Sequence, residues 1–363
     1  MSVRSAIVHM LLGVSYHLGG PALNDAVRGG QVRLLMYHGI PRGERGDGIV
    51  NAHGYNVPLR VFERHVAYLV RHCHVVGLSD ALSGDRLSRR KTNVILTFDD
   101  GYENTYVNAF AMLRRYGIPA TFGLPTAFVC DREPLWNDVL EYAVQKSQKT
   151  RVSMAWDGRE DVFSLEDRAA RLLLYDWLMD HCLRITQSQR SALISSALAA
   201  LGISVTSDEL FQEADYRPLS AEQIREMAAS GLAEFASHSV HHYALTNLGR
   251  EEQGLELVAS KHKVEELTGR PCTVFCVPAG IYDENVLEQI WSAGYQWVLT
   301  SDRGAADLRR RVLNRNCVYR ERRLYTFADV THGPVFEAMA AVRNRLDGTR
   351  ARLVRLETEW TRA

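Results

Sequence analysis

Short apolar runs alternate with stretches of helical periodicity along most of the chain. Seven apolar runs have the length of strands: Val32–Tyr37, Val94–Phe98, Ala120–Leu124, Ala233–Ala236, Thr273–Val277, Trp297–Thr300 and Leu313–Val318. Amphipathic segments with helix start signals lie between them, for example after the capping box of Ser220 and Gln223. This alternation predicts an α/β fold built of βα units, with a parallel sheet or barrel.

The region between Asp131 and Arg217 breaks the alternation. Its apolar spacing predicts two helices, Ser164–Leu183 and Thr186–Leu201, the second with a capping box of its own. We interpret residues 131–217 as an inserted helical subdomain, which either packs over the main domain or covers its mouth and shapes substrate choice. The expected units are therefore an N-terminal helix at 1–30, one barrel-like domain made of 31–130 and 218–330, the insertion at 131–217, and a C-terminal helix at 331–363.

The first thirty residues contain an amphipathic helix. Five apolar residues share one helical face: Ile7, Met10, Leu11, Val14 and Leu18. The apolar stretch is interrupted by His9, is too short to span a bilayer, and precedes no clean cleavage site. The helix is expected to pack on the body or, alternatively, to make a peripheral membrane contact. We expect a cytoplasmic location, at the inner membrane under the second alternative, with export left open.

Length, charge and cysteine spacing indicate a large globular protein and argue against a basic nucleic-acid-binding protein or a small disulfide-rich one. A chain of 363 residues with 46% hydrophobic residues can bury a large core. Lys+Arg and Asp+Glu both number 43, and this zero net charge argues against a nucleic-acid partner held by a global basic field. The six cysteines are not spaced as in a small disulfide scaffold, so we expect buried free thiols.

Two adjacent carboxylates at a strand end are the strongest chemical signal. Asp99 and Asp100 follow the run Val94–Phe98 and precede Gly101. Adjacent carboxylates repel unless a cation or a shared proton offsets the repulsion, and Gly101 lets the backbone turn both toward one site. We expect one to hold a metal and the other to handle a proton. The structural alternative is capping of a helix that begins near Asn104.

Three histidines follow the strand Ala233–Ala236. His238 and His242 are four residues apart and share a face if a helical turn follows, so both can ligate a zinc-like metal. His241 then points elsewhere, and Ser239 can cap the turn. One Asp and two His would leave positions open for water and substrate, as a catalytic metal site requires. The alternative for each of these histidines is a structural role, with its ring nitrogens hydrogen-bonded inside the protein.

The motifs Thr97-Phe98-Asp99-Asp100-Gly101 and His238-Ser239-Val240-His241-His242 together resemble those of the polysaccharide deacetylase family, carbohydrate esterase family 4. The resemblance covers roughly residues 32–128 and 219–318. It implies a distorted (β/α)7 barrel, known as the NodB-like barrel. It also implies Asp99 as catalytic base and Asp100, His238 and His242 as ligands of a divalent metal, with zinc expected and cobalt, nickel or manganese as alternatives.

A further motif points to one branch of that family. Leu35-Met36-Tyr37-His38 is similar to the L-x-Y-H motif of bacterial exopolysaccharide deacetylases, including those acting on poly-N-acetylglucosamine. The resemblance implies His38 as general acid; a plain strand end is the alternative. We expect Tyr37, Trp297 or an aromatic residue of the insertion to stack on a sugar ring.

The third motif of the family is incomplete. Phe275–Gly280 resembles it, but Cys276 and Val277 stand where the family often has an Arg that orients the catalytic Asp. Arg315 is our candidate substitute for this residue. Other arginines lie nearby as alternatives: Arg310, Arg311 and Arg320.

The resemblance implies a hydrolase of carbon–nitrogen amide bonds. We expect metal-dependent removal of the N-acetyl group from an amino sugar in a bacterial polysaccharide or its precursor, with an N-acetylated glycan or glycolipid as partner. One alternative is a deacylase or deformylase of a lipid-linked or small sugar. Another is a non-catalytic glycan-binding barrel, which the incomplete third motif favours.

Overall fold

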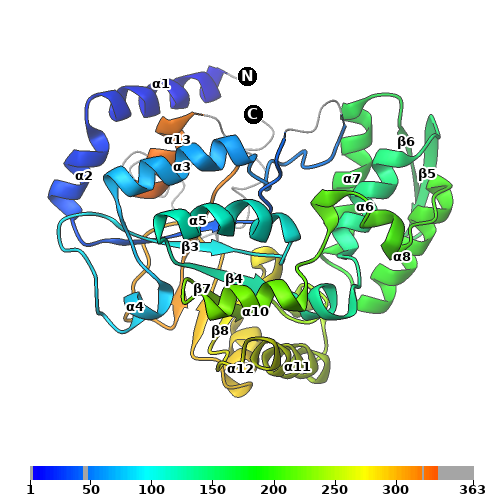
Figure 1. Ribbon diagram of the computed structural model, residues 1–363. Helices are drawn as coiled ribbons and strands as arrows, with labels where there is room; N and C mark the ends of the chain where they lie inside the picture. The colour runs from blue at the N-terminus through cyan, green and yellow to red at the C-terminus, as the bar shows by residue number, and fades with distance from the viewer. Residues whose placement is uncertain (1–2, 44–47, 321–322, 334–363) are drawn as a thin grey trace.

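The main body of the protein is built on one parallel sheet (Figure 1). The computed structural model describes residues 3–43, 48–320 and 323–333. The strand order is β10-β9-β8-β7-β4-β3-β1-β11, with β2 paired to β3, and each of these pairs is parallel. The strands are β1 (Val32–Tyr37), β2 (His74–Val75), β3 (Asn93–Phe98), β4 (Ala120–Leu124), β7 (Ala233–Ser237), β8 (Val274–Cys276), β9 (Trp297–Leu299), β10 (Val312–Leu313) and β11 (Arg315–Cys317).

Successive side chains of each strand point to opposite faces of the sheet, and both faces are apolar. Both must therefore be shielded from water, and helices pack around the sheet. On one face, Tyr37, Phe98 and Phe122 pack with residues of the surrounding helices; on the other, Leu34 and Ile95 pack with residues of the neighbouring strands. The helices of the main body are α3 (Leu59–His72), α4 (Leu78–Leu82), η1 (Thr105–Phe110), α5 (Ala111–Tyr116), η2 (Ala127–Asp131), α9 (Ser207–Leu210), η3 (Ala214–Tyr216), α10 (Ala221–Ala229), η4 (Leu245–Asn247), α11 (Arg250–Thr268), η5 (Pro278–Gly280), α12 (Glu284–Ser292) and α13 (Leu324–His332).

The last predicted strand, Leu313–Val318, is divided in two. Only Asn314 separates β10, which pairs with β9, from β11, which pairs with β1 at the other end of the strand order. β10 and β11 are adjacent in the chain but lie at opposite ends of the strand order. The sheet must therefore curve to bring its two edges near each other. The predicted α/β fold with a parallel sheet is confirmed, and its closure into a barrel stays a prediction.

The region 131–217 is not purely helical, as the sequence had suggested. Besides α9 and η3, which pack with the main body, its elements are α6 (Trp136–Lys146), β5 (Arg151–Trp156), β6 (Arg159–Ser164), α7 (Arg168–Cys182) and α8 (Gln187–Leu201). The predicted helix Ser164–Leu183 is wrong at its start, because β5 and β6 form an antiparallel hairpin and α7 begins only after its cap, Asp167. The predicted capping box of Thr186 and Gln189 is confirmed. These elements share an apolar cluster of their own, centred on Leu140, Leu178 and Leu193.

The N-terminal region contains two helices instead of one. Gly19, in the left-handed region at φ 79°, separates α1 (Val3–His17) from α2 (Gly20–Arg28). Leu12 is buried and α1 packs on α13, but the predicted apolar stripe points to solvent at Met10, Val14 and Leu18. The expectation that the apolar stripe packs on the body is therefore wrong for these three residues. The side chain of Ile7 is not among those that the structure describes. None of the described helices combines the length and apolarity needed to cross a membrane.

Two further expectations concern the cysteines and the C-terminus. All six cysteines are free thiols, five of them buried, as predicted. The C-terminal helix expected at 331–363 falls almost entirely outside the described residues, since α13 ends at His332.

Candidate metal and catalytic site

The candidate site lies where neighbouring parallel strands end. The register pairs Tyr37 of β1 with Phe98 of β3, and Leu124 of β4 with Ser237 of β7. The residues that follow these pairs, including His38, Asp99 and His238, therefore emerge at one edge of the sheet.

Asp100, His238 and His242 form one compact group. The Oδ1 atom of Asp100 lies 3.5 Å from Nε2 of His238 and 3.4 Å from Nε2 of His242. One ligand atom from each residue lies within 4.8 Å of the others. Asp100 Oδ1 is buried and has no hydrogen-bond partner among the described residues. Burying such a carboxylate oxygen costs free energy unless a cation interacts with it. A carboxylate oxygen with two imidazole nitrogens is a donor set that suits zinc and similar divalent metals.

The backbone is forced into unusual conformations to bring these ligands together. Asp100 and His242 both have left-handed backbones, with φ of 72° and 57°, as do Gly101 and Ser239. For residues other than glycine this conformation is strained, and such strain concentrates at functional sites. The expected helical turn is absent at 238–242, but Ser239 does bond the backbone there, since its Oγ accepts a hydrogen bond from the amide N–H of His242 at 3.0 Å.

Residues around the histidine loop hold it in place. His238 Nδ1 lies 2.8 Å from the carbonyl oxygen of Cys276, which favours an N–H at Nδ1 and leaves the Nε2 lone pair toward Asp100. Trp136 of α6 donates its indole N–H to the carbonyl oxygen of His242 at 3.1 Å. On the other side, Glu256 of α11 accepts the amide N–H of His241 and contacts its ring, so His241 points away from the group, as expected.

Asp99 is held by a buried arginine from β11, two strands away from β3 in the sheet order. Arg315 Nη1 and Nη2 donate to the two carboxylate oxygens of Asp99 at 2.8 and 2.7 Å, and both residues are almost fully buried. Arg315 Nη1 also lies 3.7 Å from Sγ of Cys276, the residue at the incomplete third motif. The alternatives lie elsewhere: Arg310 faces Asp307, Arg311 stacks on Trp291, and Arg320 bonds the backbone near Gly54.

These contacts set the charges in the site. Burial by itself would raise the pKa of Asp99, but the Arg315 guanidinium and the neighbouring histidines keep it below its ordinary value. Burial likewise opposes ionisation of Asp100, and the surrounding histidines lower its pKa. Burial lowers the pKa of His242 to about 4, so its imidazole is neutral at pH 7, the state that binds metals.

His38 lies beside this group together with an aromatic residue that the sequence did not single out. Its ring is 5.4 Å from the ring of Tyr55, and Tyr55 in turn is 5.5 Å from Tyr319. Tyr55 keeps 40% of its surface exposed, although it sits next to the candidate acid. The loop that carries it is closed by mutual hydrogen bonds of Asn51 and Asn56, a contact with no periodic signature.

The residues expected to stack on a sugar are placed elsewhere. Tyr37 is fully buried, because alternation along β1 turns its ring toward Phe62 and Phe98 instead of the site. Trp297 begins β9 and therefore lies at the amino end of the sheet, opposite the site. Both expectations are wrong, and Tyr55 is the exposed aromatic residue in contact with His38.

Comparisons with known proteins agree with the geometry. A family model described as polysaccharide deacetylase matches residues 86–148 and 186–298. YxkH of Bacillus subtilis (strain 168), whose name assigns it to the polysaccharide deacetylases, is 22% identical over 277 residues, which are 75% of this chain. The matched region spans 65% of that relative's length.

Solved structures share the fold at low sequence identity. BA0330 of Bacillus anthracis, described as a polysaccharide deacetylase, has a TM-score of 0.53 at 19% identity, covering 83% of this chain and 69% of its own. The deacetylase PplD of Streptococcus pyogenes, solved with acetate, has a TM-score of 0.54 at 16% identity, covering 83% and 98%. IcaB of Ammonifex degensii has a TM-score of 0.50 at 18% identity, with the same coverage.

Proposed function

The chain belongs to the polysaccharide deacetylase family, a family of hydrolases of carbon–nitrogen amide bonds, and from that premise we propose that it removes N-acetyl groups from amino-sugar residues of a polysaccharide. The observation that carries the proposal is the position of Asp99. This carboxylate is kept ionised by Arg315 and lies 3.9 Å from His238 of the metal-type group. A base held beside a divalent-cation site is what hydrolysis of an unactivated amide requires.

The proposed mechanism assigns one task to each residue. A divalent metal held by Asp100, His238 and His242 would supply a more acidic water and a polarised acetyl carbonyl. Asp99 accepts the proton as the water oxygen attacks the carbonyl carbon. His38 gives a proton to the sugar nitrogen as the carbon–nitrogen bond breaks. The products are acetate and the free amine of the sugar.

Arg315 is a positioning residue in this scheme. Its two N–H groups fix both oxygens of Asp99, so the base keeps one orientation and stays ionised near neutral pH. This contact also weighs against the alternative of a non-catalytic glycan-binding barrel. That alternative drew its support from the incomplete third motif, and in this chain the missing guanidinium comes from β11.

We propose a bacterial exopolysaccharide of N-acetylated amino sugars as the substrate class. The L-x-Y-H motif that ends at His38 supports this class, and exposed Tyr55 beside His38 offers a ring face for a sugar. Removal of an acyl group from a lipid-linked or small sugar is the competing substrate assignment.

The test is acetate release by purified protein loaded in turn with zinc, cobalt, nickel or manganese. Oligomers of N-acetylglucosamine and an undecaprenyl-linked N-acetyl sugar serve as competing substrates. We expect release from the oligomers, and loss of turnover in Asp99→Asn with metal binding retained. Absence of acetate release with every metal, in protein that calorimetry shows to bind the metal, would refute the activity; preference for the lipid-linked sugar would refute the substrate class.

A further inference from the structure

The helices α1 and α2 lie at one edge of the molecule (Figure 1), and several of their large apolar side chains are exposed. The exposed fractions are 82% for Leu18, 74% for Val27, 67% for Leu23 and 61% for Met10. These side chains all come from the two consecutive helices joined at Gly19. Large exposed apolar surfaces on a folded protein mark contact sites.

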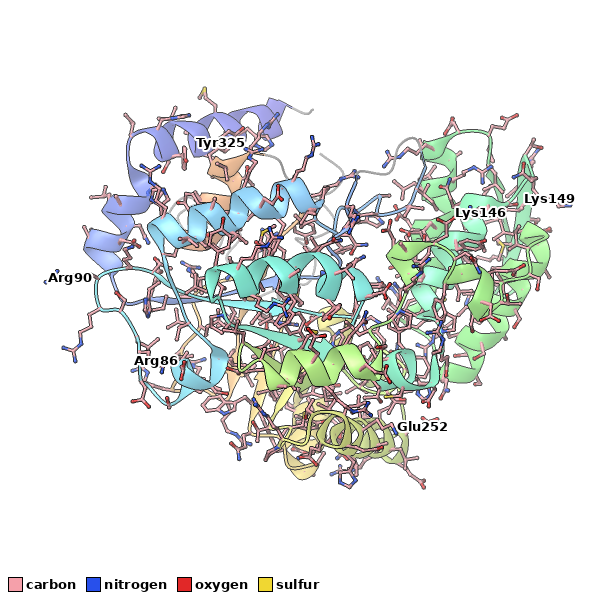
Figure 2. The ribbon with its side chains drawn as sticks, viewed as in Figure 1. Arg86, Arg90, Lys146, Lys149, Glu252 and Tyr325 are labelled. Atoms are coloured by element: carbon pink, nitrogen blue, oxygen red, sulfur yellow. The ribbon has the colours of Figure 1, made fainter. Side chains whose placement is uncertain are left out.

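A basic loop borders this surface. Residues 84–91 contain Arg86, Arg89, Arg90 and Lys91 against the single acidic residue Asp85. The loop lies against the end of α2, because the amide N–H of Gly30 donates to the carbonyl oxygen of Lys91 at 3.3 Å. Figure 2 shows Arg86 and Arg90 on the same side of the molecule as α2.

The acidic residue of α2 does not offset this charge. The Asp25 carboxylate is turned inward, where it accepts the hydroxyl hydrogen of Thr92 at 2.6 Å and contacts the ring of His332 at 3.1 Å. Arg86 is paired with Asp80 at 3.3 Å, so the excess positive charge comes from Arg89, Arg90 and Lys91. The exposed part of α1, α2 and the loop therefore combines apolar side chains with a net positive edge.

We propose that α1, α2 and the loop 84–91 form a docking surface for an anionic lipid bilayer. The apolar side chains would enter the interface between headgroups and acyl chains, while the arginines and the lysine would lie among the lipid phosphates. A second copy of the chain would bring the same positive edge to the contact. An anionic bilayer, in contrast, complements both the apolar and the charged part of the surface.

The topology then fixes how the site faces the membrane. The chain runs from α2 into the start of β1, and from the loop 84–91 into the start of β3, so the part of the docking surface formed by α2 and the loop lies at the amino end of the parallel strands. The candidate site lies at their carboxyl ends, about 20 Å away along strands of six residues. If the proposed function is correct, the docked protein presents its site away from the bilayer, toward a polymer.

Sedimentation with vesicles tests the docking surface, using full-length protein without added metal. We expect binding to vesicles of phosphatidylglycerol and phosphatidylcholine, and weak binding to phosphatidylcholine alone. The double variant Leu18→Gln/Leu23→Gln should bind at least roughly tenfold more weakly. Leu173→Gln/Leu255→Gln is the matched control, since these leucines are 62% and 66% exposed on other elements.

The charged edge has its own variant and control. Arg89→Gln/Arg90→Gln should weaken binding to anionic vesicles roughly tenfold or more and reduce its salt dependence. Arg151→Gln/Arg159→Gln, on the distant hairpin, should leave binding unchanged. Circular dichroism and thermal unfolding identify any variant that fails to fold; the singly substituted proteins then replace it.

Three outcomes would overturn the docking proposal: no sedimentation of wild type with anionic vesicles, equal binding to neutral vesicles, or a dimer in analytical ultracentrifugation that Leu18→Gln/Leu23→Gln dissociates. Because vesicle binding is measured without catalysis, it can fail while acetate release from soluble oligomers persists, and the reverse. The two proposals are therefore tested separately.

Discussion

Replacement of Arg315 by Met is the sharpest test of how this site is organised. In the wild type, the Arg315 guanidinium bonds both oxygens of Asp99 at 2.8 and 2.7 Å in a fully buried setting. Removing one partner of such a pair leaves a buried charge without compensation, which destabilises a protein by about 3–5 kcal/mol. We expect a loss of this size in the free energy of unfolding at pH 7.

The loss should depend on pH in a defined direction. The pKa of Asp99 is lowered in the folded wild type, so its stabilising contribution is present above the unfolded pKa of about 4 and disappears as the pH falls through the folded value. In Arg315→Met, only the neighbouring histidines still oppose the effect of burial, so the pKa of Asp99 is higher than in the wild type. The stability difference between wild type and variant should therefore be largest near neutral pH and shrink toward pH 3.

Guanidinium unfolding of metal-free protein at several pH values measures this difference, and the pH dependence of kcat/KM measures the base directly. The acidic limb of the profile should move to higher pH in Arg315→Met, because a protonated Asp99 accepts no proton. Adding Asp99→Asn to Arg315→Met should recover much of the stability, since it removes the unpaired charge. Arg309→Met, at an exposed pair with Asp307, is the control and should change neither quantity. An unchanged acidic limb with unchanged stability would refute the reasoning.

Four further outcomes are expected. Gly123→Ala should lower kcat/KM at least roughly tenfold with metal affinity unchanged, because its Cβ would lie 2.9 Å from Oδ1 of Asp99; kinetics and calorimetry separate the two. His38→Gln should lower kcat by roughly 10²–10⁴, again with metal retained, as an acetate-release assay will show. Trp136→Phe removes the hydrogen bond to the carbonyl oxygen of His242 and should weaken metal affinity by roughly tenfold or more, with an altered cobalt absorption spectrum. Chelation should abolish acetate release, and zinc should restore it while raising the melting temperature.

The strands were predictable because their residues are buried on both faces. Val32–Tyr37 and Ala120–Leu124 are observed with the predicted bounds, as largely apolar strands of a parallel sheet that are buried along their whole length. The candidate metal ligands were predictable for a related reason. Polar residues directly after such strands emerge at one edge, so Asp100 and His238 meet although 138 positions separate them.

The misses have equally local causes. Asp157 and Gly158, with φ of 50° and 73°, form a tight turn between β5 and β6, and this hairpin dipeptide lies just before the predicted helix Ser164–Leu183. The choice of Arg315 among four neighbouring arginines depends on the register of β11, which pairs Arg315 with Leu34. The position of Tyr55 depends on a loop closed by side-chain hydrogen bonds. Sequence periodicity carries no information about either contact.

The exchange at the third motif follows from the electrostatics of a buried carboxylate. Asp99 needs a cation nearby to stay ionised, but nothing in that requirement fixes the strand that supplies it. Because β11 pairs with β1 next to β3, a long side chain at position 315 reaches the same oxygens. Cys276 is small enough to leave that space to Arg315, and Gly123 adds no side chain to it. The incomplete motif is therefore compatible with an ionised Asp99, because β11 supplies the guanidinium that Cys276 and Val277 do not.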